Sequence, residues 1–221
     1  MVRTCGTVLD LRRSGGCEVN DVNHSPEMAA ATKGGRVLLF ARNFFRHPLM
    51  LGSIVPSSRF LIRELLSPVD WSRARVIVEY GPGVGVITAE VLRRMRPDAL
   101  LIAIEMNPDF VSYLRGALTD TRLRVFEGSA ERVDEILDRC GRQQADYIIS
   151  GIPFSTIAAP LRERILRRTR AALAPDGAFL VYQFSSRVFA DLKRVFGYVA
   201  RKFEPLNVLP AHLFICQPQA A

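Results

Sequence analysis

The most specific feature of the chain is a glycine-rich segment, Glu79-Tyr80-Gly81-Pro82-Gly83-Val84-Gly85. It follows an apolar run at 75–79 and precedes a segment with helical periodicity at 86–95. Glycines between a strand and a helix let the backbone approach a nucleotide closely and adopt positive φ at little steric cost. The spacing is G-x-G-x-G, which differs from the G-x-G-x-x-G of dinucleotide sites, and no Gly-Lys-Ser/Thr follows as in a P-loop. The spacing therefore argues against a pyrophosphate cradle.

A second carboxylate follows at a spacing typical of nucleoside sites. Glu105 lies twenty residues beyond Gly85, in the run Ile104-Glu105-Met106-Asn107 at the end of the next predicted strand. An acidic residue at that place in an α/β sheet accepts hydrogen bonds from ribose hydroxyls. Taken separately, the loop fits an ordinary tight turn and Glu105 fits a solvated strand end. Together, in this strand-and-helix context, they indicate a cofactor that contains a ribose.

The fourth predicted strand ends in a proline loop, Ser150-Gly151-Ile152-Pro153-Phe154. Backbone carbonyls just before the proline can accept hydrogen bonds from an amine, and Phe154 can stack on a planar base or face a developing ammonium. The alternative interpretation is a proline turn whose aromatic side chain belongs to the core. No Asn or Asp precedes Ile152, which disfavours a nucleobase as the group that this loop binds.

The elements that must hold these loops alternate between strand and helix. Strands are predicted at 75–79, 100–104, 123–126, 145–149 and 178–183, and helices at 86–95, 109–118, 131–139, 159–173 and 187–195. Apolar strands that alternate with helices predict a parallel sheet covered on both faces. Two final apolar runs, 199–203 and 212–216, have no helix between them and are expected to pair as antiparallel strands. The expected fold is α/β, with a seven-stranded, mostly parallel sheet.

Composition sets outer limits on the function. The chain has 221 residues, is 48% hydrophobic and carries a formal net charge of +8, which predicts an anionic partner such as nucleic acid or a membrane surface. Four scattered cysteines show neither a disulfide framework nor zinc-ligand spacing, so we expect free thiols and no metal. No apolar run approaches the roughly 20 residues that span a bilayer, and no secretory signal is evident.

The positive charge is concentrated near the N-terminus. Residues 1–63 carry nine basic and four acidic groups, and no acidic residue lies between Glu27 and Glu64. We expect a mobile tail at 1–32, an amphipathic helical segment at 33–66 that docks on membrane, and an α/β domain at 67–221. The residues expected to contact lipid are Lys33, Arg36, Phe40, Arg42, Phe44 and Arg46. The alternative is that the apolar members of this segment pack on the domain while the arginines are solvated.

The glycine loop preceded by an acid resembles motif I of the class I S-adenosylmethionine-dependent methyltransferases, which have a Rossmann-like fold. The resemblance implies S-adenosylmethionine as cofactor. The residues it assigns to cofactor binding are Glu79, Tyr80, Gly81, Pro82, Gly83, Gly85, Glu105, Met106, Gly128, Ser129, Ala130, Ser57 and Ser58. Related enzymes often have Asp at the position of Ser129, whose uncharged hydroxyl can still accept a hydrogen bond from adenine.

The series of motifs between residues 33 and 216 is similar to that of the bacterial phospholipid N-methyltransferases. The part specific to that family is Gly52-Ser53-Ile54-Val55-Pro56-Ser57-Ser58 with the basic helix before it. The resemblance implies methylation of phosphatidylethanolamine toward phosphatidylcholine at the inner face of the cell membrane by a cytoplasmic protein. Ornithine lipid or another aminolipid is an alternative acceptor. Ribosomal RNA adenine dimethylation is a further alternative, disfavoured because little sequence follows the last strand.

The proposed chemistry needs a neutral amine, since an aliphatic ammonium has a pKa near 10 and cannot attack the methyl group. Desolvation lowers that pKa, so a strong base need not be present. Tyr147, Tyr182 and His212 are candidates for a proton relay. The remaining expectations are an anionic membrane surface and an aminolipid as partners, no nucleic acid partner, and a monomer.

Overall fold

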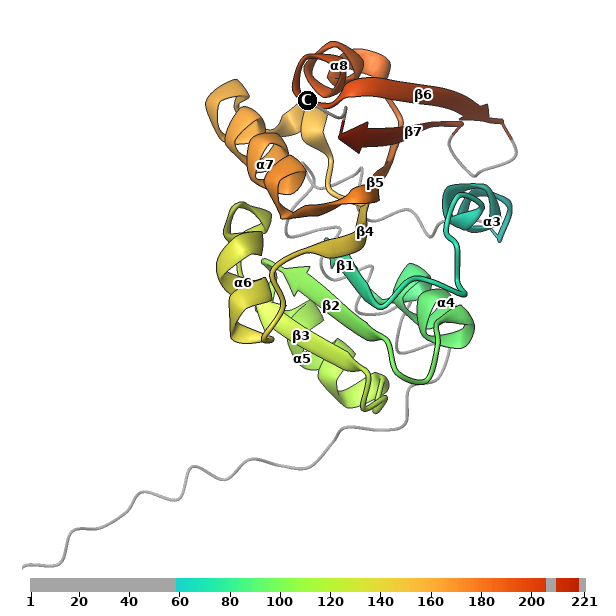
Figure 1. The fold of residues 1–221 in the computed structure, drawn as a ribbon, viewed down its shortest axis with the longest axis vertical. Coiled ribbons are helices and arrows are strands. Elements are labelled where there is room, and N and C mark those ends of the chain that lie inside the picture. The colour runs from blue at the N-terminus through green and yellow to red at the C-terminus, as the bar shows by residue number, and fades with distance from the viewer. Residues whose placement is uncertain (1–58, 206–209, 219–221) are drawn as a thin grey trace, which may run out of the picture.

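The computed structural model describes residues 59–205 and 210–218, which contain one seven-stranded sheet in the order β3-β2-β1-β4-β5-β7-β6 (Figure 1). The strands are β1 (Val76–Tyr80), β2 (Leu100–Glu105), β3 (Leu123–Glu127), β4 (Ala145–Ser150), β5 (Leu173–Gln183), β6 (Gly197–Glu204) and β7 (Ala211–Pro218). Strands β1 to β5 pair in parallel, and β7 is antiparallel to both β5 and β6. The predicted mostly parallel sheet and its antiparallel final pair are both confirmed.

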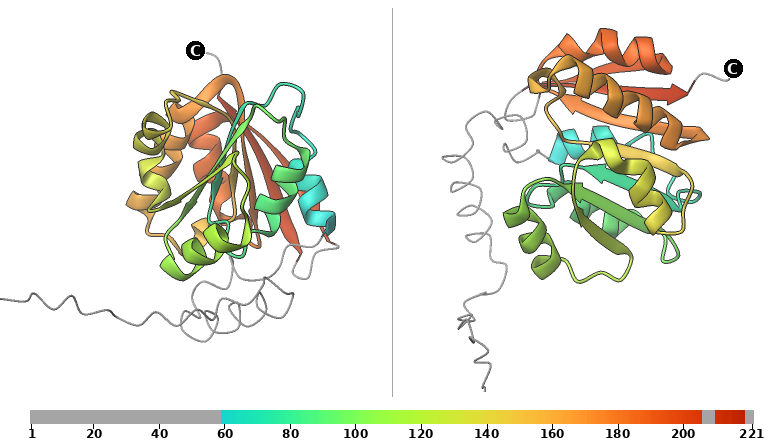
Figure 2. Two further views of the ribbon diagram at one scale, coloured as in Figure 1. Left: turned by 90° about the horizontal axis from the view of Figure 1, so that it is seen from below. Right: turned by 90° about the vertical axis from the view of Figure 1, so that its left-hand side faces the viewer.

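Helices cover both faces of the sheet (Figures 1 and 2). One face carries α3 (Arg59–Leu66), α4 (Val86–Arg94) and α5 (Pro108–Ala117); the other carries α6 (Val133–Arg139), α7 (Ala159–Ala172) and α8 (Phe189–Phe196). Three 3-10 turns precede or follow these helices: η2 (Ala130–Arg132), η3 (Phe154–Thr156) and η4 (Ser186–Val188). Within the described ranges, no helix has the length and apolar character needed to cross a membrane.

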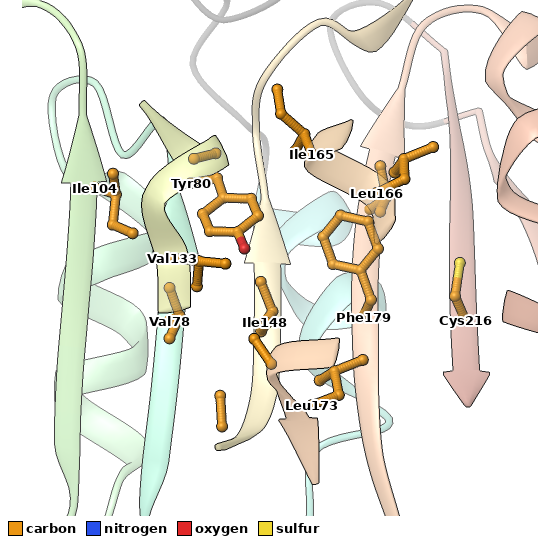
Figure 3. Packing of buried hydrophobic residues seen from close by; sticks show 14 of the residues in the cluster. Val78, Tyr80, Ile104, Val133, Ile148, Ile165, Leu166, Leu173, Phe179 and Cys216 are labelled. Carbon is orange, nitrogen blue, oxygen red and sulfur yellow. The ribbon is translucent and has the colours of Figure 1, made fainter. Parts of the chain in front are cut away.

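The strands at the centre of the sheet are apolar on both faces because both faces are buried. In β1, Ile77 points into the core under α3 and α4, whereas Val78 and Tyr80 point into the core under α6, α7 and α8. Figure 3 shows the second core, where Phe179 of β5 is fully buried near Tyr80. Complete burial of one such side chain stabilises the fold by about 1.5–3 kcal/mol. This core places the carboxyl ends of β1 and β4 next to each other.

Most predicted boundaries agree with the structure within a few residues, and the largest difference is at β5. The sequence predicts a strand at 178–183, but β5 begins at Leu173, directly after α7. The pairing of β4 with β5 is irregular between Ala145 and Tyr147. A Cβ at Gly177 would lie 2.8 Å from the carbonyl oxygen of Asp146, so glycine is needed where the two backbones approach. The Pro-Asp-Gly segment at 175–177 therefore lies at an irregularity within β5. In the prediction it fell between the helix at 159–173 and the strand at 178–183.

Candidate cofactor and acceptor site

The loops that follow β1, β3 and β4 meet at the carboxyl edge of the sheet. Each begins with a backbone N–H that donates to the carbonyl at the end of a neighbouring strand. These bonds run from Gly81 to Ile104, from Gly128 to Glu105 and from Gly151 to Tyr80, each at 2.9 Å. A parallel sheet aligns its strand ends at one edge, and these three bonds fix the loops there. Motifs separated by up to seventy residues are thus brought together.

The glycine loop needs its three glycines for different reasons. Gly81, Gly83 and Gly85 all have positive φ, at 66°, 57° and 74°. A Cβ at Gly81 would lie 2.7 Å from Cγ2 of Ile152, so this glycine lets the proline loop at 150–154 approach; we call that loop the acceptor loop. A Cβ at Gly85 would lie 2.6 Å from Cδ2 of Leu114, so this glycine lets α4 pack on α5. The loop is shaped by packing as well as by the ligand expected to occupy it.

Glu105 lies beside the glycine loop with both carboxylate oxygens oriented by backbone donors. Gly83 N donates to Oε2 at 3.1 Å and Asn107 N donates to Oε1 at 2.9 Å. Burial raises the pKa of Glu105, whereas these backbone N–H groups oppose that rise. Each oxygen keeps a lone pair, so the carboxylate can still accept two ribose hydroxyls. This donor and acceptor arrangement fits the ribose of S-adenosylmethionine.

Glu79 occupies a different position from the one the motif suggests. Its side chain is 1% exposed, and its Oε2 accepts a 2.7 Å hydrogen bond from the Thr88 hydroxyl in the first turn of α4. Burial raises the pKa of Glu79 to about 7, the Thr88 bond lowers it, and the charge of Glu105 raises it further. The carboxyl therefore lies behind the loop and braces it against α4. The sequence did not indicate a role for Thr88, although its position three residues after Gly85 places it in the first turn of the helix that follows the glycine loop.

The expected adenine region lies between the ends of β2 and β3. Met106 is 67% exposed, an unusual state for a large apolar side chain beside a site, and a Cβ at Gly128 would meet no atom within 4 Å. The open space at Gly128 and the exposed thioether fit a planar base lying between them. Ser129 Oγ accepts from Glu131 N at 3.2 Å and caps η2, which leaves one lone pair for a ligand. Ala130, by contrast, is buried in the core, so its side chain faces away from this region.

Tyr80 is also a core residue. Its side chain is fully buried, and its hydroxyl lies 3.1 Å from the hydroxyl of Thr169 on α7. Burial raises the pKa of the Tyr80 phenol above its usual range. The side chain of Tyr80 therefore faces the core, because alternation along β1 directs position 80 toward α7. Its backbone carbonyl still belongs to the site, since it holds Gly151.

The acceptor loop lies directly against the glycine loop. Ser150 is fully buried, and a Cβ at Gly151 would lie 3.1 Å from both the Gly81 carbonyl and the Tyr182 hydroxyl. The carbonyl just before the proline, Ile152 O, accepts from Phe154 N at 3.0 Å and from Gln183 Nε2 at 2.8 Å. A carbonyl oxygen has two lone pairs. Both lone pairs of this carbonyl have protein donors in this arrangement, so an amine would bond to it only by displacing Phe154 N or Gln183 Nε2.

Phe154 does not present its ring to a ligand. The side chain is fully buried and meets Phe179 edge-on, with ring centroids 6.2 Å apart and planes at 85°. This geometry is favourable for two aromatic rings in a core. The predicted stacking or cation–π role of Phe154 is wrong, and the alternative of a core aromatic after a proline turn is correct. The reason is that η3 turns residue 154 back beneath β5.

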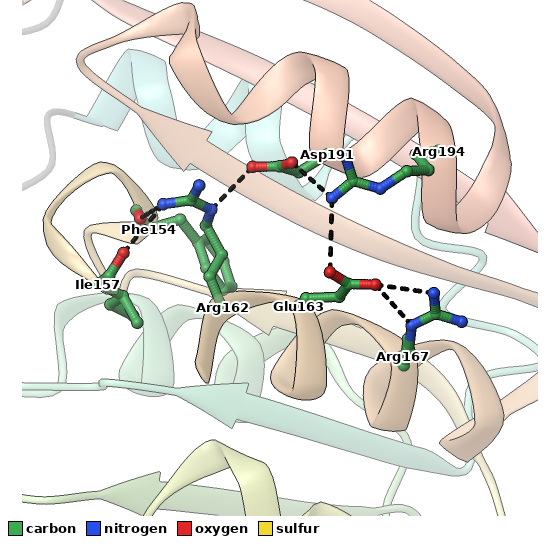
Figure 4. Close-up of polar contacts among 7 residues, drawn as sticks. All are labelled: Phe154, Ile157, Arg162, Glu163, Arg167, Asp191 and Arg194. Carbon is green, nitrogen blue, oxygen red and sulfur yellow. Dashed lines mark hydrogen bonds and ion pairs between the residues drawn. The ribbon is translucent and has the colours of Figure 1, made fainter. Parts of the chain in front are cut away.

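Two side chains that the sequence did not indicate hold the acceptor loop from outside. Gln183, at the end of β5, is 4% exposed and donates to Ile152 O. Arg162, in the first turn of α7, donates to Phe154 O at 3.3 Å and Ile157 O at 2.9 Å, and pairs with Asp191 of α8 at 2.8 Å (Figure 4). The sequence offered two signals for these supports. One is a polar residue, Gln183, at the end of the strand that follows the acceptor loop, and the other is Arg162 in the helix between that loop and that strand.

Comparison with known families decides the class of this chain. Residues 51–204 match the methyltransferase small domain, which is about two thirds of the sequence. The chain belongs to the methyltransferase small domain family. It is a class I methyltransferase that uses S-adenosylmethionine, and the residues at its carboxyl edge fit that cofactor as described above.

Individual relatives of the methyltransferase fall into two groups. It is 34% identical over 181 residues to ornithine lipid N-methyltransferase of Singulisphaera acidiphila, covering 81% of this chain and 94% of the relative. It is 31% identical over 123 residues to ribosomal RNA small subunit methyltransferase A of Methylococcus capsulatus, covering 55% of this chain and 41% of the relative. In structure it is similar to human methyltransferase-like protein 13 in complex with SAH, with a TM-score of 0.53 and 19% identity over 78% of this chain and 81% of that one.

The three candidates for a proton relay lie in different places in the methyltransferase. Tyr147 is at the opposite edge of the sheet, where its hydroxyl accepts from Asp70 N, so its prediction is wrong. Tyr182 reaches the acceptor loop at Gly151. His212 pairs in register with Gln183, lies 3.1 Å from Arg201 Nη2, and has a pKa lowered by burial and by that arginine. Tyr182 is therefore the candidate that borders the acceptor loop.

Several predicted positions of the methyltransferase lie outside the described residues. They are the tail at 1–32, Ser57, Ser58 and the expected lipid contacts Lys33, Arg36, Phe40, Arg42, Phe44 and Arg46. Of the predicted segment at 33–66, α3 is described, and it ends at Leu66 as expected. Among residues 59–205 and 210–218, no three His, Cys, Asp or Glu side chains are grouped as a metal would require.

Proposed function

We propose that this methyltransferase transfers methyl groups from S-adenosylmethionine to the amine of a membrane aminolipid, with ornithine lipid as the leading acceptor. The observation that carries the proposal is the similarity to ornithine lipid N-methyltransferase, which extends over 94% of that relative. The similarity to the ribosomal RNA enzyme of Methylococcus capsulatus extends over 41% of that relative. A match over nearly all of a relative supports a shared class of acceptor. A match over less than half of a relative supports only the cofactor-binding fold that both groups have.

In this proposal the cofactor lies over the glycine loop, with Gly81 and Gly83 beneath its methionine part, Glu105 on the ribose hydroxyls, and Met106, Gly128 and Ser129 around the adenine. S-adenosylmethionine supplies a methyl group on a positively charged sulfur. The chain's own task is to orient the acceptor and exclude water. The contact between Gly81 and Ile152 supports this arrangement, because it places the acceptor loop beside the cofactor loop.

The acceptor loop supports an aliphatic amine more than a nucleobase. Between Ser150 and Phe154 no carboxamide or carboxylate side chain is present to bond the edge of a planar base, and Phe154 is buried where it cannot stack on one. Tyr182 lies beside Gly151, is 6% exposed and belongs to the apolar core under α3 and α4. Such surroundings lower the pKa of an ammonium and favour the neutral amine that attacks the methyl group.

The order of lipid acceptors differs from the order that the sequence motifs suggest. The motifs resemble those of phospholipid N-methyltransferases and favour phosphatidylethanolamine. The relative that this chain matches over 94% of its length is an ornithine lipid N-methyltransferase. Both lipids present a primary aliphatic amine. We therefore rank ornithine lipid first and phosphatidylethanolamine second, and we propose that residues 33–46 bring the enzyme to the membrane surface that contains them.

The decisive experiment incubates the full-length protein with methyl-labelled S-adenosylmethionine and, separately, ornithine lipid, phosphatidylethanolamine and ribosomal RNA. We expect label in the chloroform phase with ornithine lipid, resolved by chromatography as methylated product. Label with phosphatidylethanolamine alone would replace the leading acceptor, and label in RNA would overturn the lipid class. The Glu105→Gln variant provides the control, because it should reduce incorporation in whichever reaction is the true one.

A further inference from the structure

A groove of about 660 Å³ lies between α3 and α4, and every described residue that lines it belongs to one of these two helices. The helices lie side by side on one face of the sheet (Figures 1 and 2). Four arginines line the groove: Arg59 and Arg63 from α3, and Arg93 and Arg94 from α4. Thirty residues of sequence separate the two pairs, so only the tertiary structure brings them together.

The positive charge of the groove exceeds its negative charge. Glu90 is the acidic residue among its lining, and it accepts hydrogen bonds from Arg93 at 2.7 Å and from Arg94 at 2.6 Å. Arg63 lies 3.5 Å from Glu64, which does not line the groove. Arg59 makes no ion pair within the part of the chain that the structure describes. Among the described residues that line the groove, four guanidinium groups and one carboxylate leave a surplus of positive charge that an anion can neutralise.

Apolar side chains also line the groove, from Phe60 and Ile62 of α3 and from Val86 and Ala89 of α4. Ile62 is buried, and the guanidinium carbons of Arg59 and Arg63 lie 5.1 and 5.8 Å from the centre of the Phe60 ring. Arginines held over an aromatic ring keep their planar donors oriented, while their stems cover apolar surface. The upper end of the groove includes Val86, the residue directly after Gly85 of the cofactor loop. From there the groove extends to Arg93 and Arg94 in the last turn of α4.

We propose that the groove between α3 and α4 binds the phosphate group of an acidic phospholipid and so docks the enzyme on the membrane that contains its substrate. A single guanidinium can bind two phosphate oxygens through two parallel hydrogen bonds, and the groove carries arginines on both of its walls. The apolar side chains of the lining suit the glycerol and first acyl carbons of a lipid. The inference rests on the proposed lipid function. It adds α4 to the parts of the enzyme that contact the membrane, beyond the basic segment proposed at 33–46.

The test uses the full-length protein and vesicles of phosphatidylcholine with or without phosphatidylglycerol. The double variant Arg59→Gln/Arg93→Gln removes one charge from each wall. A basic residue near an anionic surface contributes about 1 kcal/mol, so the variant should reduce the partition coefficient for phosphatidylglycerol vesicles by roughly 25-fold. The matched control is Arg142→Gln/Arg170→Gln, which removes the same charge from exposed positions outside the groove. It should reduce partitioning far less, and thermal unfolding should show all three proteins folded.

Three outcomes would overturn the groove assignment: unchanged partitioning of the groove variant, an equal loss in the control, or a loss of RNA binding without a loss of vesicle binding. The last outcome would make the groove a nucleic-acid site. Methylation of ornithine lipid dispersed in detergent is measured in parallel. In that assay the groove variant should keep the parental kcat, because no membrane surface is involved. Failure of the parental protein in that assay refutes the proposed function and leaves the vesicle result standing on its own.

Discussion

The glycine loop at 81–85 and the acceptor loop at 150–154 lie against each other at the sheet edge, but different parts of the chain hold them. Local features shape the glycine loop: positive φ at three glycines, the start of α4, and the carboxylate of Glu105 on the next strand. The acceptor loop has one backbone bond to β1, and its other supports are side chains from β5 and α7.

This difference explains why one loop is readable in the sequence and the other is not. Glycine spacing and an acid at a strand end are requirements of residue type, and they recur wherever a nucleoside cofactor is bound this way. The supports of the acceptor loop need only a long polar side chain that reaches a carbonyl, so many residues at several positions can supply them. Variants of the two loops should therefore fail in different ways.

The largest effect is expected for Gly85→Ala. The residue has φ of 74°, and the new methyl group would lie 2.6 Å from Leu114 Cδ2, so strain in the backbone adds to overpacking of α4 on α5. The sum should destabilise the fold by about 3 kcal/mol and abolish cofactor binding. Urea unfolding and calorimetric titration with S-adenosylmethionine measure the two effects.

Gly141→Ala is the matched control, because Gly141 has φ of 67° but open space around the position of a Cβ. It should cost about 1 kcal/mol and leave cofactor affinity unchanged. Equal losses in the two variants would show that the helix contact at Gly85 is unimportant, and that backbone conformation alone shapes the loop.

The buried carboxyl behind the glycine loop should make stability depend on pH. The pKa of Glu79 is raised from 4.5 to about 7, with burial as the main cause. The stability that this group contributes is fully present below about pH 4.5 and is lost as the pH rises through about 7, a change on the order of 3 kcal/mol. Glu79→Gln, which remains neutral and can still accept from Thr88, should show a smaller decrease in unfolding free energy between pH 5 and pH 8. A parental protein whose pH dependence matches that of the variant would contradict this role.

Arg162→Met tests the acceptor loop. The substitution removes the donors to Phe154 O and Ile157 O and leaves Asp191 with Arg194 as its pairing partner. We expect a loss of about 2 kcal/mol in stability and a lower kcat for methyl transfer, with unchanged affinity for the cofactor. Arg167→Met on the same helix is the control, because that side chain is 68% exposed and its pairing with Glu163 is worth less than about 1 kcal/mol. Weakened cofactor binding in Arg162→Met would mean that the two loops are not held independently.

The smallest effect is expected for Glu105→Gln. The amide keeps one acceptor oxygen but turns an NH₂ group toward the N–H of Gly83 or Asn107, and it loses the charge that strengthens bonds from ribose. Calorimetry should show S-adenosylmethionine affinity reduced about tenfold, with little change in folding stability. Glu127→Gln is the control, since Glu127 is its exposed register partner on β3. An unchanged affinity in Glu105→Gln would remove the ribose assignment.

The sequence predicted the mostly parallel sheet, the turn at the glycine loop and the place of Glu105 at the end of the next strand, because periodicity and glycine spacing are local properties. It left open whether Phe154 faces a ligand or the core, and it did not show that the side chain of Tyr80 lies in the core. Aromatic type is compatible with a ligand platform and with a core equally well, and only the packing of α7 and β5 decides between them. It also missed Gln183 and Arg162, since hydrogen bonds to a backbone carbonyl leave no pattern in a single sequence.

The sequence alone determined the class of fold, the cofactor and the identity of the two loops, since these depend on residue types at short spacings. Only the tertiary structure decided which carbonyls and side chains remain available to a substrate. The same holds for the arginines of α3 and α4, which form one groove although about thirty residues separate them. The physical reason is that side-chain burial and long-range pairing arise when helices pack on the sheet, and the chain carries no local record of those contacts.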